Sequence, residues 1–353
     1  MRRLGYLQTL RHPRHLGAIA LPALLLIGVL TGCDSVPPAC ADSSFTTSAG
    51  PAAGWNDRFH DYADNNARMD DLSGADGAPS TLLPDGRRVW AFGDTFLGAV
   101  TPTHGRALNT PMISNTYVEE SGGALTRTLI GGTSTAPAAF LRPPTTGSFY
   151  WPAGAVVEGT KLRVLVNEWS GTGLDLTHKG TGFVTLNLPG LTVDTTAPRQ
   201  IAIRGGVAYG AILPEGSTTY FYGVKDRELY VARVPAGQSL GQWEYRTSSS
   251  WSTDPGQATP VTSSAGGVEG VKVVKMGRCF VLLTFQPGVF FPTADIRAYV
   301  GNSPVGPWSP GTHVLTIPES TRTDVLWYGA WPHDSLVSGS SVVPRLRWAG
   351  CRW

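Results

Sequence analysis

Small residues gather in five stretches of the chain, and these stretches recur at intervals of 56 to 77 residues. They are SGADGAPSTLL (73–83), YWPAGAVVEG (150–159), GGVAYGAILPEG (205–216), SAGGVEGVKVV (264–274) and WYGAWPHDSLV (327–337). Four of them precede a turn and a strongly apolar run, such as VWAFGDTF or CFVLLTF, and a further strand-like run follows. Repeated units of three or four strands at this period predict an all-β fold, a five-bladed β-propeller.

The order of the runs within each unit has a physical cause in a propeller. The innermost strands of all blades converge on a narrow axis, so small residues collect where the backbones approach one another. The middle strands are covered by the neighbouring blades and therefore consist of continuous apolar residues. A β-sandwich or a two-sheet jelly roll is the alternative fold, but neither explains why the small residues precede the apolar run each time.

Residues 1–32 have the layout of a secretory signal. Several arginines are followed by an apolar run at 16–30 and then by the letters LTGC, which end at Cys33. This ending resembles a bacterial lipobox, which implies cleavage before Cys33, a lipid on that cysteine and an extracytoplasmic, membrane-anchored location. A membrane-spanning helix is the alternative, but the run is near the lower length limit for a span and contains Pro22.

The rest of the chain divides into a tether and one domain. Residues 33–54 are rich in Ser, Pro, Ala and Gly, which predicts a flexible tether. Residues 55–353 form the predicted propeller domain, which we expect to be a monomer. The formal net charge is +2 and the domain has no basic run, so we expect no nucleic acid among its partners.

The cysteines fit an oxidising compartment but leave the disulfide pairing open. With Cys33 used by the lipid, Cys40, Cys279 and Cys351 remain. Cys279–Cys351 and Cys40–Cys351 are the two alternative pairings that we expect. No CxxC pair or His-rich spacing suggests zinc, so we expect no cofactor; whether a cation lies near His333 on the propeller axis stays open.

Asp94 lies in the run VWAFGDTFLG (89–98), whose aromatic residues are typical of a strand covered on both faces. A carboxylate in such a place must find hydrogen bonds or shift its pKa. Two interpretations stay open. In the first, Asp94 accepts hydrogen bonds from the backbone of the next loop. In the second, it reaches the mouth of the central channel beside Asp76, where one carboxylate raises the pKa of the other.

Polar residues at the blade starts are the main site candidates, because the ends of the inner strands line one mouth of the channel. Three of them can take part in chemistry: Asp76, Glu269 and His333. Each also has a structural interpretation. Asp76 can be a turn residue, Glu269 a solvated strand end, and His333 a hydrogen-bonded core residue.

Paired carboxylates and aromatic rings are what glycoside hydrolysis requires. One acid protonates the leaving oxygen, while the other activates water or attacks the anomeric carbon. We expect Asp76 to act as base or nucleophile, Glu269 as general acid, and Asp94 to orient or tune Asp76. Trp and Tyr rings stack on the apolar faces of sugars. The expected substrate-binding residues are Trp151, Tyr209, Trp331, His333 and, more weakly, Asn115.

The motif GADGAPSTLLPDGRRVWAFGDTFLG (74–98) resembles the first blade of an actinobacterial secreted family, domain of unknown function 5005. A related family, number 4185, shares its FGDTF core. Further matches are YWPAGAVVEGTKLRV, YVGNSPVGPWS and PHDSLV, so the resemblance covers about residues 55–348. Family 4185 is similar to five-bladed glycoside hydrolases and includes the endo-D-arabinanases of glycoside hydrolase family 183, which act on arabinofuranose polymers of cell walls.

The wider five-bladed class, such as glycoside hydrolase family 43, places an Asp base at the start of blade 1, and Asp76 matches that place. The same class uses an Asp from blade 2 and a Glu acid from blade 3, where this chain has PAG (152–154) and YGA (209–211). The resemblance therefore implies a glycoside hydrolase with a different proton donor, acting on a cell-envelope or environmental polysaccharide, with arabinofuranose-containing glycans favoured. A carbohydrate-binding module without chemistry and a scaffold that docks another protein are the alternatives.

Overall fold

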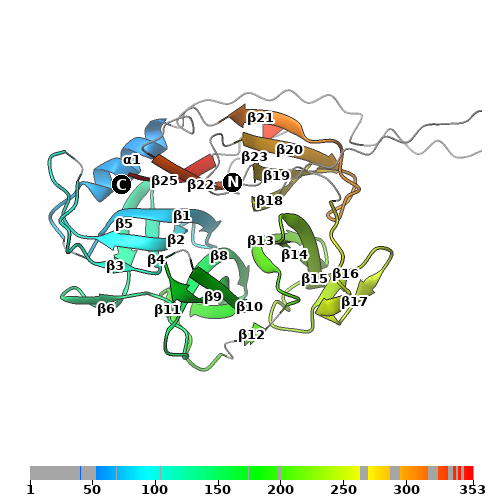
Figure 1. Ribbon diagram of the computed structural model, residues 1–353, viewed down its shortest axis with the longest axis horizontal. Coiled ribbons are helices and arrows are strands. Elements are labelled where there is room, and N and C mark those ends of the chain that lie inside the picture. The colour runs from blue at the N-terminus through cyan, green and yellow to red at the C-terminus, as the bar shows by residue number, and fades with distance from the viewer. Residues whose placement is uncertain are drawn as a thin grey trace, which may run out of the picture. The chain divides into compact units, whose positions relative to one another are not determined.

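The computed structural model describes Cys40 and residues 53–68, 70–103, 105–173, 175–197, 200–202, 204–262, 269–286, 295–316, 325–332, 337–338, 341–342 and 346–352. These residues form a β-propeller, so the predicted fold class is confirmed (Figure 1). Four sheets of four or five strands follow one another along the chain, and a two-stranded sheet follows the fourth.

The first two blades are built around long antiparallel hairpins. Blade 1 has the order β1–β2–β4–β5, with β3 paired to β2, and blade 2 has the order β8–β9–β10–β11, with β12 paired to β10. The strands of blade 1 are β1 (Leu72–Leu82), β2 (Arg88–Leu97), β3 (Met112–Ile113), β4 (Thr116–Ser121) and β5 (Ala124–Leu129). The short pair β6 (Gly131–Thr133) and β7 (Ala136–Ala138) lies between the blades in sequence. The strands of blade 2 are β8 (Ser148–Glu158), β9 (Lys161–Thr172), β10 (Asp175–Asn187), β11 (Thr192–Val193) and β12 (Gln200–Ala202).

The next two blades repeat this plan in sequential order. The strands of blade 3 are β13 (Ala208–Glu215), β14 (Thr218–Lys225), β15 (Glu228–Pro235), β16 (Glu244–Arg246) and β17 (Trp251–Ser252), followed by the short 3₁₀ helix η2 (Pro255–Gln257). The strands of blade 4 are β18 (Glu269–Met276), β19 (Cys279–Gln286), β20 (Asp295–Gly301) and β21 (Thr312–Thr316). The last strands are β22 (Val325–Pro332), β23 (Val337–Ser338), β24 (Ser341–Val342) and β25 (Leu346–Arg352), with β22 paired to β25 and β23 to β24.

The first strand of each unit lies innermost. Strand β1 contacts β8, β8 contacts β13, β13 contacts β18, β18 contacts β22, and β22 contacts β1 in turn (Figure 1). The sheet β22–β25 therefore lies between blade 4 and blade 1. Because only two strands of this sheet belong to the described residues, the count of five blades stays a prediction.

A break in the strand register explains the small residues at the blade starts. In every inner strand the pairing with the next strand shifts inside the small-residue stretch: around residue 76 in β1, 153–154 in β8, 210 in β13, 270 in β18 and 329 in β22. A β-bulge adds an unpaired residue and bends the strand locally. The recurring feature of the sequence is therefore a recurring bulge at the same level of each inner strand.

The apolar middle strands are covered on both faces, as expected. In β9, Val164 packs in a cluster with Val89 of β2, whereas the adjacent Leu165 packs in a second cluster with Phe221 of β14. Blade 2 thus buries one face of its sheet against blade 1 and the other against blade 3. Burying one such aliphatic side chain contributes roughly 1.5–3 kcal/mol.

The helix α1 (Ala53–Ala63) was not expected from the sequence, which shows almost no helical periodicity. Its buried Phe59 lies 5.1 Å from the ring of Trp90 in blade 1, measured between ring centroids, and Trp55 lies 5.0 Å from the same ring. An 11-residue helix is marginal in isolation, so these aromatic contacts stabilise it. Among the described residues, no helix has the length and apolarity needed to cross a membrane.

The disulfide joins Cys40 to Cys279, so neither expected pairing with Cys351 is correct. The two Cα atoms are 5.8 Å apart, although 239 residues separate the cysteines in sequence. The backbone N–H of Cys40 also donates a hydrogen bond to Oδ1 of Asn302, at 2.7 Å. Cys40 lies within the predicted flexible tether, yet it is buried and fastened to blade 4. The tether prediction is therefore wrong at this position.

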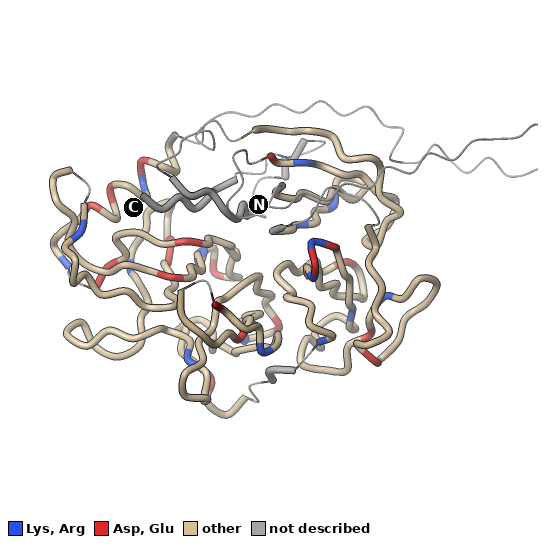
Figure 2. Tube along the Cα trace, in the orientation of Figure 1, with Lys and Arg blue, Asp and Glu red and all other residues tan. Residues whose placement is uncertain are grey.

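Lys and Arg are interspersed with Asp and Glu over the described blades, as Figure 2 shows. Many of the charges are paired, for example Arg87 with Glu119 at 2.8 Å and Arg163 with Glu158 at 3.1 Å. This distribution accords with the low net charge of +2.

Candidate functional site

Asp76 is the residue at which the strand register between β1 and β2 shifts. Its neighbours Ala75 and Gly77 pair with Thr95 and Phe92, respectively. Gly77 has a φ of 75°, a left-handed conformation that glycine adopts without strain. Asp76 and Gly77 therefore lie at a bulge inside β1 and not in the expected turn before a strand, and from this bulge the Asp76 carboxylate reaches across β2.

The Asp76 carboxylate lies over Gly93, where a side chain would collide with it. A Cβ atom at position 93 would clash with Oδ1 of Asp76 and would lie 3.5 Å from Cδ1 of Trp151. Gly93 thus provides the space in which an acid of β1 and an indole ring of β8 come together. Blades 1 and 2 both contribute to this contact, which lies beside the bulges of their inner strands, β1 and β8.

Asp94 follows Gly93 and contacts the same indole. Nε1 of Trp151 donates a hydrogen bond to Oδ1 of Asp94 at 3.1 Å. Burial, and not the charge of Asp76, raises the pKa of Asp94 above its ordinary value, and the hydrogen bond from Trp151 partly opposes this rise. Within the described part of the chain, Trp151 is the hydrogen-bond partner of Asp94, rather than the backbone of the next loop. Asp76 and Asp94, called the acid pair below, therefore lie beside one tryptophan.

Arg106 lies at the start of β1, where it contacts Ser73, and the sequence carried no signal for it. The loop between β2 and β3 returns Arg106 to the start of β1, where its Nη2 donates to the carbonyl oxygen of Ser73 and its Nε to Ser73 Oγ at 3.3 Å. The guanidinium also lies 5.2 Å from the centroid of the Phe96 ring. The Arg106 guanidinium thus contacts Ser73, which lies three residues before Asp76 in β1.

Tyr209 does not occupy a position where it could stack on a ligand. Its side chain is fully buried and meets the ring of Trp243 edge-on, with 5.3 Å between the centroids. Its carbonyl oxygen accepts a hydrogen bond from Nδ2 of Asn167 at 3.0 Å. The expected sugar contact is corrected to a packing role between blades 2 and 3.

Asn115 is also a structural residue and not a surface for substrate. It is fully buried, and its Nδ2 donates to the carbonyl oxygens of Leu141 and Tyr150 at 2.8 and 2.9 Å. Its Oδ1 accepts from the backbone N–H of Leu141 at 2.7 Å. These three bonds join blade 1 to the segment that leads into β8, so the side chain has no group left for a sugar.

The remaining candidates are placed only in part. Glu269 is the first residue of β18 and pairs with Phe285 just before the bulge, and Trp331 lies in β22. His333 and Cys33 lie outside the described residues. The described residues contain no group of three His, Cys, Asp or Glu side chains that could hold a metal ion.

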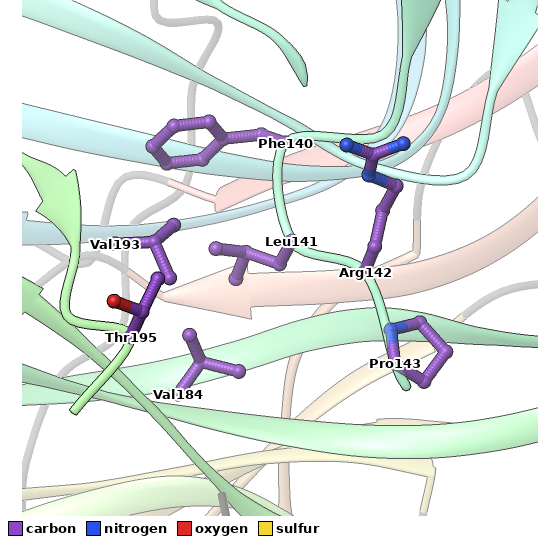
Figure 3. A pocket seen from close by; sticks show the side chains of 7 residues that line it. All are labelled: Phe140, Leu141, Arg142, Pro143, Val184, Val193 and Thr195. Atoms are coloured by element: carbon purple, nitrogen blue, oxygen red, sulfur yellow. The ribbon is translucent and has the colours of Figure 1, made fainter. Parts of the chain in front are cut away.

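A cavity of about 400 Å³ lies elsewhere, beside β10 and β11 (Figure 3). Its lining consists of Phe140, Leu141, Arg142, Pro143, Val184, Val193 and Thr195. The lining is mostly apolar and includes no carboxylate and no member of the acid pair. We therefore place the candidate site at the acid pair and not at this cavity.

Comparisons with known proteins agree with the fold. The family described as "Domain of unknown function (DUF5005)" matches residues 57–344. No curated protein sequence matches the chain. Among solved structures, a candidate hydrolase from Bacteroides ovatus ATCC 8483 has a TM-score of 0.62 and 19% identity, covering 76% of this chain and 74% of its own. This likeness shows the fold alone.

Two glycoside hydrolases are among the more distant structural neighbours. The GH43_1 enzyme from Xanthomonas citri has a TM-score of 0.47 and 13% identity, covering 85% of this chain and 93% of its own. An exo-beta-1,3-galactanase from Phanerochaete chrysosporium has a TM-score of 0.46 and 14% identity, covering 78% of this chain and 60% of its own.

Proposed function

We propose that this chain, which belongs to the DUF5005 family, hydrolyses glycosidic bonds of a polysaccharide. The observation that carries the proposal is the meeting of Asp76, Asp94 and Trp151 at the bulge level of the first two blades. Two carboxyl groups with unlike environments and an adjacent aromatic ring are the elements of a glycosidase site. The likeness to a candidate hydrolase with the same fold gives further support.

The two members of the acid pair take different roles. Asp76 is partly exposed and lies in the bulge, so it acts as base or nucleophile towards the anomeric carbon. Burial raises the pKa of Asp94 and Trp151 fixes its orientation, so Asp94 takes the orienting role beside Asp76.

Glu269 supplies the proton to the leaving oxygen. It directly precedes the bulge of β18, and Asp76 lies in the bulge of β1, so both backbones occupy the same end of their inner strands. Blade 2 has Ala153 and Gly154 at its bulge and blade 3 has Gly210, so neither of them offers an acid at this level.

The substrate is an arabinofuranose-containing polysaccharide of a cell envelope or of the surroundings. The protein reaches it as a monomer outside the cytoplasm, held to a membrane by a lipid on Cys33. A disulfide such as Cys40–Cys279 persists in oxidising compartments, which supports this location. The membrane anchor is tested by cell fractionation: wild type is expected with the membranes, and Cys33→Ser is expected to lose its lipid mass and to leave the membrane fraction.

The hydrolase is tested with the full chain, purified in detergent with its disulfide intact. Arabinogalactan and lipoarabinomannan are the substrates, and released oligosaccharides are measured. Asp76→Asn is expected to lower product release at least a thousandfold, while Asp226→Asn, an exposed turn residue between β14 and β15, is the matched control and is expected to keep activity. Equal product release from both variants would refute the assignment of Asp76.

A carbohydrate-binding module is the second candidate, favoured by the absence of an acid at the bulges of β8 and β13. It predicts that wild type releases no oligosaccharide but is retained by the polysaccharide. It also predicts that Asp76→Asn keeps the same affinity as wild type. These two results together would replace the hydrolase with a binding function.

A further inference from the structure

An aromatic strip crosses blade 2 beside the acid pair. It consists of Phe149 and Trp151 on β8, Trp169 on β9 and His178 on β10. Consecutive ring centroids are 5.3 Å apart from Phe149 to Trp151, 5.5 Å from Trp151 to Trp169, and 4.8 Å from Trp169 to His178. Because neighbouring strands are spaced by roughly 4.8 Å, the strip is roughly 10 Å wide across the three strands.

The strand register puts these rings on one face of the sheet. Trp169 pairs directly with Phe149 on one side and with His178 on the other. Directly paired residues project from the same face of a sheet. All four side chains are partly exposed, although large aromatic residues gain most from full burial. The strip is thus an apolar surface, open in part to solvent, that begins at Trp151 and runs outward from the acid pair.

A hydrogen-bond network holds the far end of the strip in place. Oδ1 of Asn167 accepts from Nε2 of His178 at 3.0 Å and from Oγ1 of Thr181 at 2.5 Å. Nδ2 of Asn167 is itself used, because it donates to the carbonyl oxygen of Tyr209. This arrangement requires the His178 tautomer that is protonated at Nε2. Burial lowers the pKa of His178, with a backbone hydrogen bond at Gly180 opposing the shift, so the ring is neutral at pH 7.

The chemistry of the strip selects one kind of occupant. Its rings are uncharged at neutral pH, and the acid pair at its inner end repels anions. Aromatic faces pack against the C–H faces of sugar rings, and a surface held rigid before binding loses little entropy. We propose that the aromatic strip binds a neutral polysaccharide chain and leads it across blade 2 to the acid pair. The catalytic part of this statement rests on the proposed function, whereas the binding part does not.

The test is the binding of polysaccharide to the full chain carrying Asp76→Asn, so that no substrate is consumed. Retardation in native gels that contain arabinogalactan or xylan reports affinity for neutral chains, and gels with polygalacturonate report affinity for an acidic one. Trp169→Ala in this background is expected to weaken retardation by arabinogalactan or by xylan at least tenfold. Polygalacturonate is tested with wild type, whose acid pair is intact, and is expected not to retard it.

Trp251→Ala is the matched control, because Trp251 is a partly exposed indole on β17 of blade 3 that packs on Tyr220 and Arg233. It is expected to bind like the parent. Trp169→Phe keeps an aromatic ring and tests the strip if the alanine variant fails to fold; it is expected to bind within threefold of the parent and to lose part of the sugar-induced change in tryptophan fluorescence.

Two results would overturn the proposal. One is a folded Trp169→Ala variant that binds neutral chains as tightly as Trp251→Ala does, and the other is tighter binding of polygalacturonate than of the neutral chains. The hydrolase is judged separately by product release from wild type. If Trp169→Ala loses binding and wild type releases no product, the aromatic strip is upheld and the hydrolase is rejected. If wild type releases product and Trp169→Ala binds unchanged, the hydrolase is upheld and the aromatic strip is rejected.

Discussion

Replacing Asn115 by alanine separates a structural role from a sugar-binding role. The substitution removes three buried hydrogen bonds, two to the carbonyl oxygens of Leu141 and Tyr150 and one from the N–H of Leu141. A typical hydrogen bond contributes about 1 kcal/mol net, and a buried group left without a partner costs about 1–3 kcal/mol. The expected loss in the free energy of unfolding is therefore about 3 kcal/mol or more.

The assay is urea unfolding, followed by tryptophan fluorescence at one pH, with the midpoint compared between variants. Asn65→Ala is the control, because Asn65 makes an exposed hydrogen bond to the N–H of Ala67 and is expected to change stability by less than about 0.5 kcal/mol. The structural role of Asn115 would be refuted if Asn115→Ala unfolds at the same urea concentration as wild type. A raised KM at unchanged stability would restore Asn115 as a substrate-binding residue.

Three further predictions concern the site and the N-terminal attachment. Gly93→Ala should displace the Asp76 carboxylate and reduce product release at least tenfold, whereas Gly210→Ala, with open space at its Cβ position, should not. Burial raises the pKa of Asp94 in the folded protein, so the stability that Asp94 adds is complete below about pH 4 and is lost as the pH rises through that pKa. In urea titrations, Asp94→Asn should therefore become more stable relative to wild type as the pH rises. Cys40→Ser should lower the free energy of unfolding by about 2–5 kcal/mol, because it opens a disulfide that spans 239 residues.

Each of these predictions has a contrary result. Equal activity of the Gly93 and Gly210 variants would mean that Asp76 does not need the space above residue 93. A stability difference between Asp94→Asn and wild type that is the same at every pH would contradict the raised pKa. If dithiothreitol lowers the stability of Cys40→Ser as much as that of wild type, the stabilising disulfide would not be the one that involves Cys40.

The blade plan was predictable from sequence because its causes are local. A covered strand consists of a continuous apolar run, and a bulge in a crowded inner strand needs small residues. The apolar run and the small-residue stretch lie within about ten residues of one another, so the propeller and the placement of Asp76 at a blade start follow from the sequence. The helix α1 was missed, because its stability comes from Phe59 and Trp55 packing on Trp90 of blade 1 and not from its own periodicity.

Which aromatic residue lies by the acids was decided by the register of the bulges. Trp151 and Tyr209 both occupy blade starts, but Tyr209 directly precedes its bulge, whereas Pro152 separates Trp151 from the bulge at 153–154. A difference of one residue along a strand reverses the face to which a side chain points. Trp151 therefore meets Asp94, and Tyr209 packs against Trp243.

The sequence by itself determined the repeated strand pattern, the acid at the start of blade 1 and the composition of the N-terminal segment. The tertiary structure alone decided the Cys40–Cys279 pairing, the hydrogen bonds of Asn115, the placement of Arg106 and the aromatic strip across blade 2. The physical reason is that strand pattern depends on neighbours along the chain. The disulfide, the hydrogen bonds of Asn115 and the aromatic strip instead depend on contacts between residues far apart in sequence, which exist only in the folded propeller.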